Sequence, residues 1–455
     1  MARKKKIDLT QVELEKGTPD VIQAPIGGIV RDAYLDFGGY INCHRHLADL
    51  DGFKVSYRRL IYTLAHSFSH TSFNHTNTAI AKVADYHPHG LSSMNEMCAT
   101  LVKAGIFEGE GSFGYVQIDG VKNEAAADRY TYIKLSDLYW DLMGDLLKDV
   151  PYVESPNGNP EPEYLPLPLP AGLHMKTINQ GLGVSISMIY PNFSAWSMYQ
   201  AYINDDPNLL EPNVDLILDK KNSELKKLWK EGKGRVVYAY KISRYTKPDD
   251  PKMQGILFET KDGTEIFTPN LKPLRKLEED GKVYIEDLTD YDSCKMAVYR
   301  IPGARGITVE DIESLCRKCC FNGTNYNLNV TDGKTTAFRI PLRAWIDFTY
   351  KRYIDLIIKS NKRKIDKTEF DIAVLEALPS VAHYILEVNP KADNIEICKK
   401  LGLSEEVVKV VMEKPISYLR KNSDTTGRVK DLKAKLKELK KFNPIAYTEE
   451  IIKRL

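Results

Sequence analysis

E-A-A-A-D-R-Y-T, at residues 124–131, places Tyr130 directly after Arg129, downstream of Y-H-P-H-G (86–90) and E-G-E-G-S-F-G (108–114). A phenol beside a guanidinium, with two histidines and a glycine-rich turn nearby, suits attack on a phosphodiester. The phenol oxygen serves as nucleophile, and cationic or donor groups stabilise the charge that grows on the phosphoryl oxygens. The sequence therefore predicts a protein that cuts nucleic acid and becomes covalently attached to it.

Helical periodicity surrounds these motifs. One apolar face is predicted over 57–68, formed by Tyr57, Leu60, Ile61, Leu64 and Phe68. Arg59 is expected on the opposite face of that helix, with Arg58 beside it. A second apolar stripe follows Gly90, formed by Met94, Met97, Cys98 and Leu101. Ser92 and Glu96, four residues apart, are expected to share the polar face of this second helix.

The rest of the chain divides by composition. The proline-rich stretch 156–170 indicates a linker or a domain boundary. Segments 235–242 and 295–301 have the composition of strands. Beyond Pro341 the pattern becomes helical, with apolar steps at Leu342, Ile346, Tyr350, Tyr353 and Ile357 and again at Val429, Leu432, Leu436 and Leu439. Two long helices in an antiparallel hairpin would explain this stepping, and so would a bundle packed on its own domain.

Composition limits the classes of function. The net charge of +2 excludes a generic polycation, so any DNA contact must come from local groups of Lys and Arg. Seven cysteines, an odd number, favour a reducing compartment over a disulfide framework. Cys316, Cys319 and Cys320 could form a metal clip, but no second Cys or His pair follows at zinc-ribbon spacing, which favours buried thiols. The basic N-terminus, M-A-R-K-K-K, is not followed by an apolar stretch, and no apolar run of membrane-spanning length occurs, so a cytoplasmic protein is expected.

Several other chemistries compete for the same residues. With 26 tyrosines in the chain, Tyr132 is a second candidate nucleophile. The pairs His44/His46 and His66/His70 could be drawn as zinc ligands, but no H-E-x-x-H is present. A relaxase or rolling-circle nuclease (the HUH type) also combines two histidines, as in His87-Pro88-His89, with a tyrosine. That motif needs its histidines on an apolar strand, whereas these lie in a loop between helical patterns.

The ordered motifs resemble those of the DNA-cleavage (A-type) subunit of type IIA topoisomerases, as in gyrase and topoisomerase IV. Y-H-P-H-G matches the family motif letter for letter, and E-G-E-G-S-F-G and A-A-A-D-R-Y-T are similar to D-G-Q-G-N-F-G and A-A-A-x-R-Y-T. Upstream, A-Y-L-D-F (33–37), R-H-L-A-D (45–49) and D-G-F-K-V-S-Y-R-R-L-I-Y (51–62) resemble the family's first helix, R-A-L-P-D and D-G-L-K-P-V-x-R-R. The likeness continues more weakly through 178–188 and 402–408. Departures include Val55 and Ala48 in place of prolines, G-V-S-I-S-M in place of G-I-A-V-G-M, and one residue missing between Asp49 and Asp51.

The resemblance implies a role for each matching residue. Tyr130 would form a 5′-phosphotyrosyl link, with Arg129 and Arg45 stabilising the transition state and His87 and His89 shaping the site. Further roles fall on Lys54, Arg58 and Arg59 as DNA-phosphate contacts, on Val184 as a residue that wedges between base pairs, and on Ser92 and Glu96 as the positions of a metal-bridged quinolone site. For Glu96 the alternative is a capping box with Ser93.

The resemblance also implies a fold that is mainly α with α+β parts. The expected order is an N-terminal arm (1–32), a winged-helix cleavage domain (33–165), a tower-like α/β domain (166–340), and a coiled coil with a helical dimer gate (341–455). Two copies would pair, which places two tyrosines on opposite strands of a duplex.

Cofactors and partners follow from motifs that this sequence lacks. The family's magnesium module, a D-x-D cluster with E-G-D-S-A, is absent, and so is any ATPase motif. Mg²⁺ and ATP are therefore expected on a partner B-type (ATPase/TOPRIM) subunit, with no metal site in this chain. Because no basic glycine-rich wrapping box follows, relaxation and decatenation are expected rather than negative supercoiling. Short A-type chains of this kind resemble those of some large bacteriophages. The competing functions are a relaxase acting alone and a non-catalytic architectural DNA-binding dimer.

Overall fold

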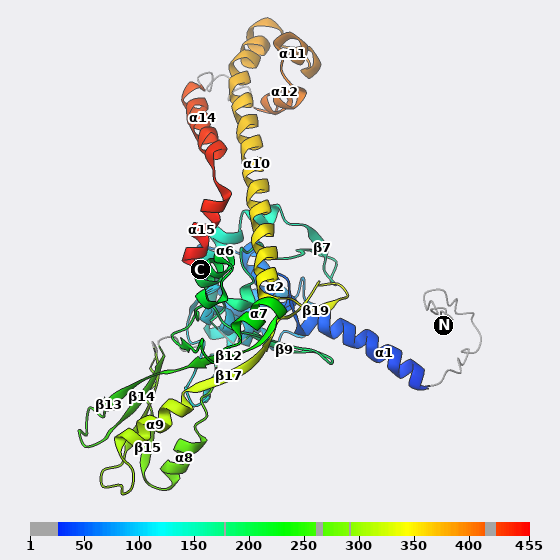
Figure 1. Cartoon of the computed structure of the whole chain (residues 1–455). Helices are drawn as coiled ribbons and strands as arrows, with labels where there is room; N and C mark the ends of the chain where they lie inside the picture. The colour runs from blue at the N-terminus through cyan, green and yellow to red at the C-terminus, as the bar shows by residue number, and fades with distance from the viewer. Residues whose placement is uncertain (1–25, 177–178, 261–266, 291–292, 415–424) are drawn as a thin grey trace.

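The computed structural model describes residues 26–176, 179–260, 267–290, 293–414 and 425–455 of the 455-residue chain. The basic N-terminal run, most of the expected arm, and Ile178 lie outside the described residues. Helices and antiparallel sheets form a central body from which three projections extend (Figure 1). Within the described ranges, none of the helices combines the length and apolar character that a membrane crossing requires.

The first packed unit combines helices with a three-stranded antiparallel sheet of order β2-β6-β3. Its elements are α2 (Val55–Ser67), β2 (Asn74–His75), α3 (Thr76–Val83), α4 (Met94–Lys103), β3 (Phe107–Glu110), β4 (Tyr115–Val116), β5 (Lys122–Asn123), β6 (Tyr132–Leu135) and α5 (Asp137–Met143). Leu60, Ile61 and Leu64 of α2 are buried, which confirms the predicted apolar face of this helix. They share one core, here called the N-terminal core, with Phe107 and Ile133 of the sheet.

The polar side of α2 differs from the prediction. Arg59 was expected opposite the apolar face, with Arg58 beside it, and both were expected to contact DNA phosphates, but each is only 7% exposed. Other segments of the chain cover this side of the helix and supply carboxylates to both guanidinium groups. The helical period locates the apolar face of a helix correctly, but it does not show whether the polar face meets water.

The proline-rich stretch is not an exposed linker. β7 (Tyr152–Glu154) and β8 (Pro160–Pro162) form a hairpin, and the chain then runs through the interior of the body. Leu165 and Leu167 belong to the N-terminal core, whereas Leu169 belongs to a second core, here called the central core. The alternation of leucine and proline therefore joins two cores instead of separating two domains through solvent.

The central core lies around a five-stranded antiparallel sheet of order β11-β12-β17-β10-β9. Its strands and covering helices are β9 (Asn179–Leu182), β10 (Ser187–Tyr190), α6 (Ala195–Asn204), β11 (Ile217–Leu218), α7 (Leu225–Glu231), β12 (Lys233–Ala239) and β17 (Phe321–Asn327). A small sheet pairs β18 (Asn329–Thr331) with β19 (Ala337–Arg339) and, in parallel, with β1 (Ala48–Asp49). Through β1 the segment before α2 is tied to the end of the central unit.

A second sheet, of order β13-β14-β16-β15, projects from the body with two helices (Figure 1). We call residues 241–319 the outer lobe; it contains β13 (Lys241–Thr246), β14 (Gln254–Thr260), α8 (Lys272–Glu279), β15 (Val283–Asp287), β16 (Cys294–Arg300) and α9 (Val309–Cys319). Both predicted strands are confirmed, although the 235–242 run is divided between β12 and β13 at Tyr240. Thr308 and Asp311 form a reciprocal capping box at the start of α9.

The helical C-terminal part contains α10 (Leu342–His383), α11 (Asn394–Leu401), α12 (Glu405–Met412), α14 (Thr426–Lys441) and α15 (Pro444–Arg454). The distal half of α10 runs beside α14 and carries α11 and α12 at its tip (Figure 1). Two ion pairs, Lys433–Glu376 and Lys440–Glu369, each of 2.7 Å, join the long helices in antiparallel order. The predicted hairpin therefore forms over this half.

The proximal half of α10 packs differently. Leu342 and Ile346 lie in the central core, and the Tyr353 hydroxyl donates to the Leu142 carbonyl at 3.0 Å. This part of the predicted apolar seam contacts the body, as the alternative of a helix packed on its own domain anticipated. Helix α15 returns to the body, where Ile451 and Ile452 are buried.

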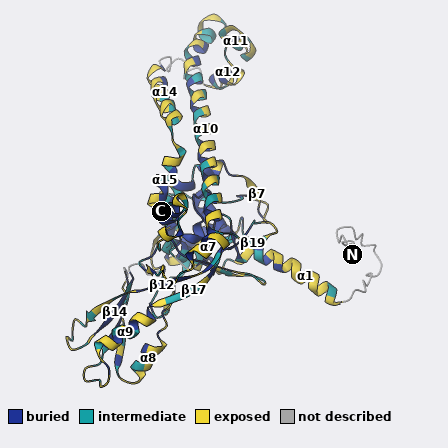
Figure 2. Cartoon of the chain, viewed as in Figure 1, coloured by how far each residue is buried: buried dark blue, intermediate teal, exposed yellow. Residues whose placement is uncertain are grey.

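Helix α1 (Ile26–Ile41) extends away from the body (Figure 1), and most of its length is exposed (Figure 2). Its exposed side chains include Ile26, Val30 and Leu35. Only the C-terminal end of this helix, near Gly38 and Tyr40, meets the rest of the described chain closely. The helix continues into a short π-helix, Asn42–His46, and the R-H-L-A-D segment (45–49) begins in the last two residues of this π-helix.

His174, at the junction of the two cores, predicts a pH-dependent stability. Burial lowers its pKa from 6.5 to about 4, so the unfolded chain takes up a proton at a higher pH than the folded chain does. Stability from this group is complete above about pH 6.5 and is lost as the pH falls toward 4. We expect His174→Gln to have a lower free energy of unfolding than wild type at pH 7.5. By pH 4.5 the difference between the two proteins should shrink by on the order of 3 kcal/mol, because only wild type loses the contribution of His174. Unfolding of both proteins at the two pH values measures this, and a deficit that is independent of pH would contradict it.

Candidate active site

Tyr130 is presented to solvent by a short 3-10 helix, Asp128–Tyr130, that precedes β6. Its side chain is 64% exposed, and its backbone N–H donates to the Ala127 carbonyl at 2.8 Å. The Arg129 guanidinium lies 4.6 Å from the centre of the Tyr130 ring, within the range of a cation–π contact. The phenol and the positive charge that the motif predicted side by side are therefore adjacent in space and open to a large ligand.

The segment that carries Tyr130 is held from several sides. Thr131 and Thr76 of α3 share a hydroxyl hydrogen bond of 2.8 Å and a backbone bond of 3.0 Å. The Asn95 amide of α4 donates to the Ala126 carbonyl at 3.1 Å. Gly111, with φ +104°, passes so close that a β-carbon there would lie 3.1 Å from the Tyr130 carbonyl oxygen. The close approach of the glycine-rich turn to this segment therefore explains why residue 111 is a glycine.

Tyr132 occupies a different environment. It lies in β6, where it pairs with His75 and Glu110 on the neighbouring strands. Its ring is half-buried, with its centre 4.2 Å from that of the His75 ring. Of the two adjacent candidates, Tyr130 is the one whose phenol projects freely.

His87 and His89 lie in the loop between α3 and α4, as the sequence indicated, and their ring centres are 5.1 Å apart. Burial, with a smaller contribution from the Arg59 charge, lowers the pKa of His87 to about 4, so this imidazole is neutral at pH 7. Arg59 Nη1 lies 3.4 Å from His87 Nδ1. Because arginine has no acceptor, Nδ1 must accept here, which leaves the proton on Nε2 as a donor.

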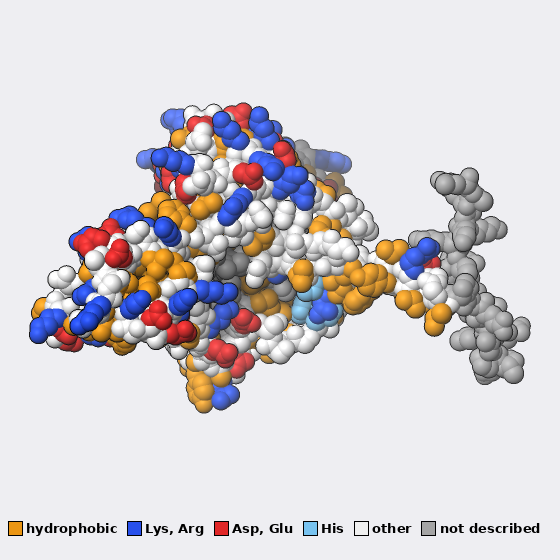
Figure 3. Space-filling model, turned by 60° about the horizontal axis from the view of Figure 1, so that its bottom comes forward, with side chains coloured by type: hydrophobic (Ala, Val, Ile, Leu, Met, Phe, Trp, Pro, Cys, Tyr) orange, Lys and Arg blue, Asp and Glu red, His pale blue; other side chains and the backbone are white. Residues whose placement is uncertain are grey.

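His89 is connected to helix α1. The Tyr40 hydroxyl and His89 Nε2 are 3.0 Å apart, and the Tyr40 ring also lies 5.2 Å from that of His44. Burial and then the positive charge of Arg45 lower the pKa of His89, which indicates that the exposed Arg45 lies near this pair. Figure 3 shows histidine side chains gathered beside a cationic group at the base of the apolar α1 projection.

The two arginines of α2 are engaged by carboxylates. Arg59 makes two bonds to Glu161, of 2.7 and 2.8 Å, and Arg58 binds Asp49 at 2.8 Å with Asp51 at 3.6 Å. Burial alone would lower the pKa of Arg58, but the two aspartates outweigh it and hold this pKa above its usual value. In this arrangement neither guanidinium is open to a DNA phosphate.

Lys54 contacts the β9–β10 hairpin, and Val184 lies in the tip of that hairpin. Lys54 Nζ donates to the Gln180 carbonyl at 2.7 Å, and burial lowers the pKa of this amine. Val184, in the tip of the hairpin, is clamped to Asn42 by bonds of 2.7 and 3.1 Å and packs against Gly38. Leu182 on the same hairpin is 78% exposed and is the freer apolar side chain.

Ser92 and Glu96 are both exposed, but only Glu96 is helical, since α4 begins at Met94. The Ser93 side chain makes no capping hydrogen bond, so the capping box that was the alternative interpretation of Glu96 does not form. Glu96 is therefore an exposed acidic residue in the first turn of α4, a position favoured by the helix dipole.

Metal ligation is not evident in the parts of the chain that the structure covers. No group of three or more His, Cys, Asp or Glu side chains there is arranged to hold an ion. Cys316, Cys319 and Cys320 are buried, and burial raises the pKa of each thiol, to about 11 for Cys320. These thiols remain protonated at neutral pH and act as small apolar side chains.

Three residues of the site were not identified from the sequence. Glu161 neutralises Arg59 from a proline-rich stretch far along the chain, Tyr40 binds His89 from α1, and Leu182 is exposed on the hairpin. The alternation of acidic residues and prolines around Glu161 carries no local signal for pairing with a helix. For Tyr40, the only signal in the sequence was its position four residues before His44.

Comparison with known proteins places the sequence that forms this site in a single family. The family model for the A subunits of DNA gyrase and topoisomerase IV matches residues 45–455, and the chain therefore belongs to this family. The DNA gyrase A subunit of Buchnera aphidicola is 23% identical over 448 residues, covering 89% of this chain and 51% of that protein. The DNA topoisomerase 4 A subunit of Staphylococcus aureus is 24% identical over 460 residues, covering 90% and 55%. The chain spans about half the length of the curated relatives it matches.

Proposed function

We propose that this chain is the DNA cleavage and religation subunit of a type IIA topoisomerase, which opens a transient double-strand break for ATP-dependent strand passage. The observation that carries the proposal is Tyr130, an exposed phenol against a guanidinium on a rigidly held segment, within a chain of the gyrase/topoisomerase IV A-subunit family.

In the proposed reaction the Tyr130 oxygen attacks a backbone phosphorus. The new P–O bond to tyrosine forms as the bond to the 3′ oxygen breaks; the phenol loses its proton and the departing 3′ oxygen gains one. One phosphodiester replaces another, so religation by the 3′ hydroxyl needs no ATP. Arg129, Arg45 and the Nε2 proton of His87 are the groups proposed to stabilise charge on the phosphoryl oxygens, with His89 shaping the site.

The arginines of α2 take a modified role in this proposal. Arg58 and Arg59 stabilise the structure around the site instead of binding phosphates, because their guanidinium groups form ion pairs with Asp49, Asp51 and Glu161. Arg59 fixes the tautomer of His87. Lys54, which donates to a backbone carbonyl and has no carboxylate partner among the described residues, is the remaining candidate of the three for a phosphate contact.

The domain assignment is part of the proposal. Helices α2–α4 with the β2-β6-β3 sheet support a winged-helix cleavage domain, the outer lobe and central sheet support a tower-like α/β domain, and α10–α15 support a coiled coil that ends in a dimer gate. Two copies of the chain would present two tyrosines to one duplex. The exposed Ser92 and Glu96 remain the positions proposed for a metal-bridged quinolone.

The described residues do not form a site that fits Mg²⁺. We propose that a B-type (ATPase/TOPRIM) subunit supplies both Mg²⁺ and ATP. The test is to incubate the chain with DNA and Mg²⁺, with and without such a partner, to trap covalent complexes by denaturation, and to map the modified residue. The proposal expects adducts at Tyr130 only with the partner. Adducts on single-stranded DNA without a partner would favour a relaxase, and no adduct in either case would favour an architectural protein.

The β9–β10 hairpin is proposed to insert an apolar side chain between base pairs. Val184 is the residue that the family resemblance suggests, but Leu182 has the more exposed side chain, and Val184 already packs on Gly38. Because burying a leucine side chain is worth about 1.5–3 kcal/mol, Leu182→Ala is expected to weaken binding of a duplex by about tenfold, and Val184→Ala by less. Fluorescence titration and bending measurements on a labelled duplex test this. A larger loss of duplex binding in Val184→Ala than in Leu182→Ala would show that Val184 is the side chain that inserts between base pairs.

A further inference from the structure

A hairpin that leads into the Tyr130 segment is fastened to the outer lobe. Strands β4 and β5 pair antiparallel, and their turn, residues 117–121, reaches α8 and the chain just before it. From the end of β5 at Asn123 the chain passes through residues 124–129 directly to Tyr130. The base of the hairpin is tight, since a β-carbon on Gly114 would lie 2.3 Å from the Asn123 carbonyl oxygen.

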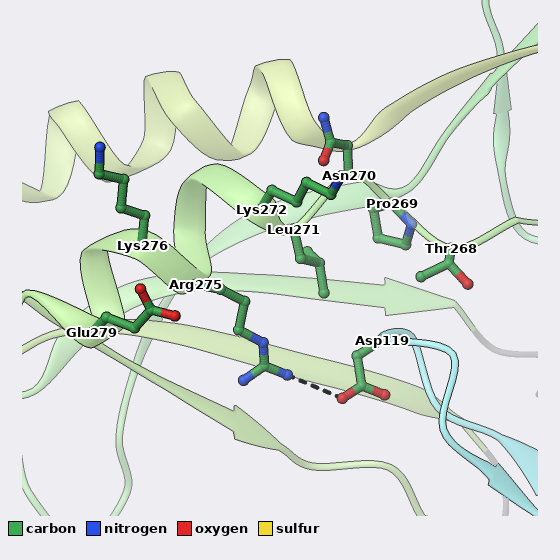
Figure 4. A pocket seen from close by; sticks show the side chains of 9 residues that line it. All are labelled: Asp119, Thr268, Pro269, Asn270, Leu271, Lys272, Arg275, Lys276 and Glu279. Carbon is green, nitrogen blue, oxygen red and sulfur yellow. Dashed lines mark hydrogen bonds and ion pairs between the residues drawn. The ribbon is translucent and has the colours of Figure 1, made fainter.

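An ion pair makes the first contact of the turn with the lobe. Arg275 Nη2 of α8 lies 3.1 Å from Asp119 Oδ2, and the Asp119 side chain is 18% exposed (Figure 4). The pair borders a pocket of about 560 Å³ that Lys272 and Lys276 also line. Figure 4 shows Lys276 directed away from Asp119 and the Lys272 side chain beside Asn270, whereas the Arg275 guanidinium is directed at the Asp119 carboxylate.

Neutral contacts reinforce the ion pair. The Cys294 thiol at the start of β16 donates to the Val116 carbonyl at 3.0 Å, and burial raises the pKa of this thiol to about 11, which keeps its proton in place. A β-carbon on Gly120, whose φ is +90°, would lie 2.8 Å from the Thr268 hydroxyl. Ile118, in the same turn, is 2% exposed and belongs to the central core.

The hairpin therefore connects two separate cores. Phe113, before β4, lies in the N-terminal core with the sheet that carries Tyr130, whereas Ile118 lies in the central core with residues of the outer lobe. A displacement of the lobe relative to the first unit must pull on this connection, because packed cores move as rigid bodies.

We propose that Asp119 and Arg275, with Ile118 and Cys294, form a latch that positions Tyr130 according to the placement of the outer lobe. Its catalytic consequence rests on the proposed function. Asp119 and Arg275 are positioning residues, since they act on the nucleophile through the hairpin.

The test uses Asp119→Asn, which is nearly isosteric and removes the charge. In the complex with the B-type subunit, Mg²⁺ and saturating DNA, the fraction of DNA held covalently is expected to fall about threefold, as for loss of one partly exposed ion pair, while DNA affinity and the thermal midpoint stay unchanged. Exchanging the charges, Asp119→Arg with Arg275→Asp, is expected to restore cleavage. In the free chain, Asp119→Asn is expected to accelerate amide hydrogen exchange at Gly120 and Ala126.

The matched control is Arg244→Gln, which breaks ion pairs of 3.0 and 3.2 Å to Glu313 and Glu310 in the same lobe, away from the hairpin. It is expected to change neither cleavage nor exchange at the hairpin. Wild-type exchange and wild-type cleavage in Asp119→Asn would overturn the latch. Failure of wild type to form any covalent complex would overturn the proposed function instead, and the exchange measurement would still decide whether the latch exists.

Discussion

Tyr130→Phe is expected to abolish covalent attachment to DNA and to lower strand passage in the presence of partner, ATP and Mg²⁺ on the order of 10⁴-fold or more. The substitution removes a single oxygen atom, which is the proposed nucleophile. Because the side chain is 64% exposed, the fold loses almost nothing. Trapped covalent complexes and relaxation of supercoiled DNA measure the effect, and an unchanged thermal midpoint excludes unfolding as its cause.

The neighbouring phenol supplies the control. Tyr132→Phe removes the same atom two residues away, from a ring in β6 that lies against His75 of β2, and is expected to leave cleavage within a few-fold of wild type. DNA binding by Tyr130→Phe should persist, since the proposed phosphate and wedge contacts are untouched. Relaxation by Tyr130→Phe at the wild-type rate would remove the catalytic assignment and leave an architectural DNA-binding protein.

The sequence predicted local features well where they depend on local spacing. The apolar face of α2 follows from the helical period, and the adjacency of Arg129 and Tyr130 follows from the chain itself. Periodicity in α10 identified a face to be buried, but it could not show that Leu342 and Ile346 pack on the body while the distal half packs on α14. A period describes one helix, and its partner is set by the rest of the fold.

The missed features are those that join distant segments. Leu165 and Leu167 lie inside a core although prolines separate them, because the chain there is extended between two packed units. Glu161 reaches Arg59 from the same stretch. Nothing local distinguishes a charged residue that will be neutralised from one that will face a ligand, so the family resemblance assigned Arg58 and Arg59 to DNA.

Arg58 provides the sharpest test of that distinction. We expect Arg58→Ala to lower the free energy of unfolding by about 3–5 kcal/mol, because it leaves Asp49 and the fully buried Asp51 without their cation. Denaturant unfolding measures the loss. Arg343→Ala is the matched control: its ion pair with Asp205 is of similar length, 2.7 Å, but is exposed, so a loss of at most about 1 kcal/mol is expected.

DNA binding separates the two roles of Arg58. A phosphate contact contributes to the salt dependence of binding, at nearly one unit of log–log slope for each contact. We expect the folded fraction of Arg58→Ala to bind a duplex with the wild-type slope, and Asp49→Asn, which removes the carboxylate 2.8 Å from Arg58, to destabilise the chain as well. Since both partners are buried, Arg58→Ala leaves the Asp49 charge without this cation, and Asp49→Asn leaves Arg58 with Asp51 alone. Their costs should therefore be less than additive in the double variant. A stable Arg58→Ala protein with a reduced salt slope would instead show that this guanidinium leaves its aspartates to bind DNA.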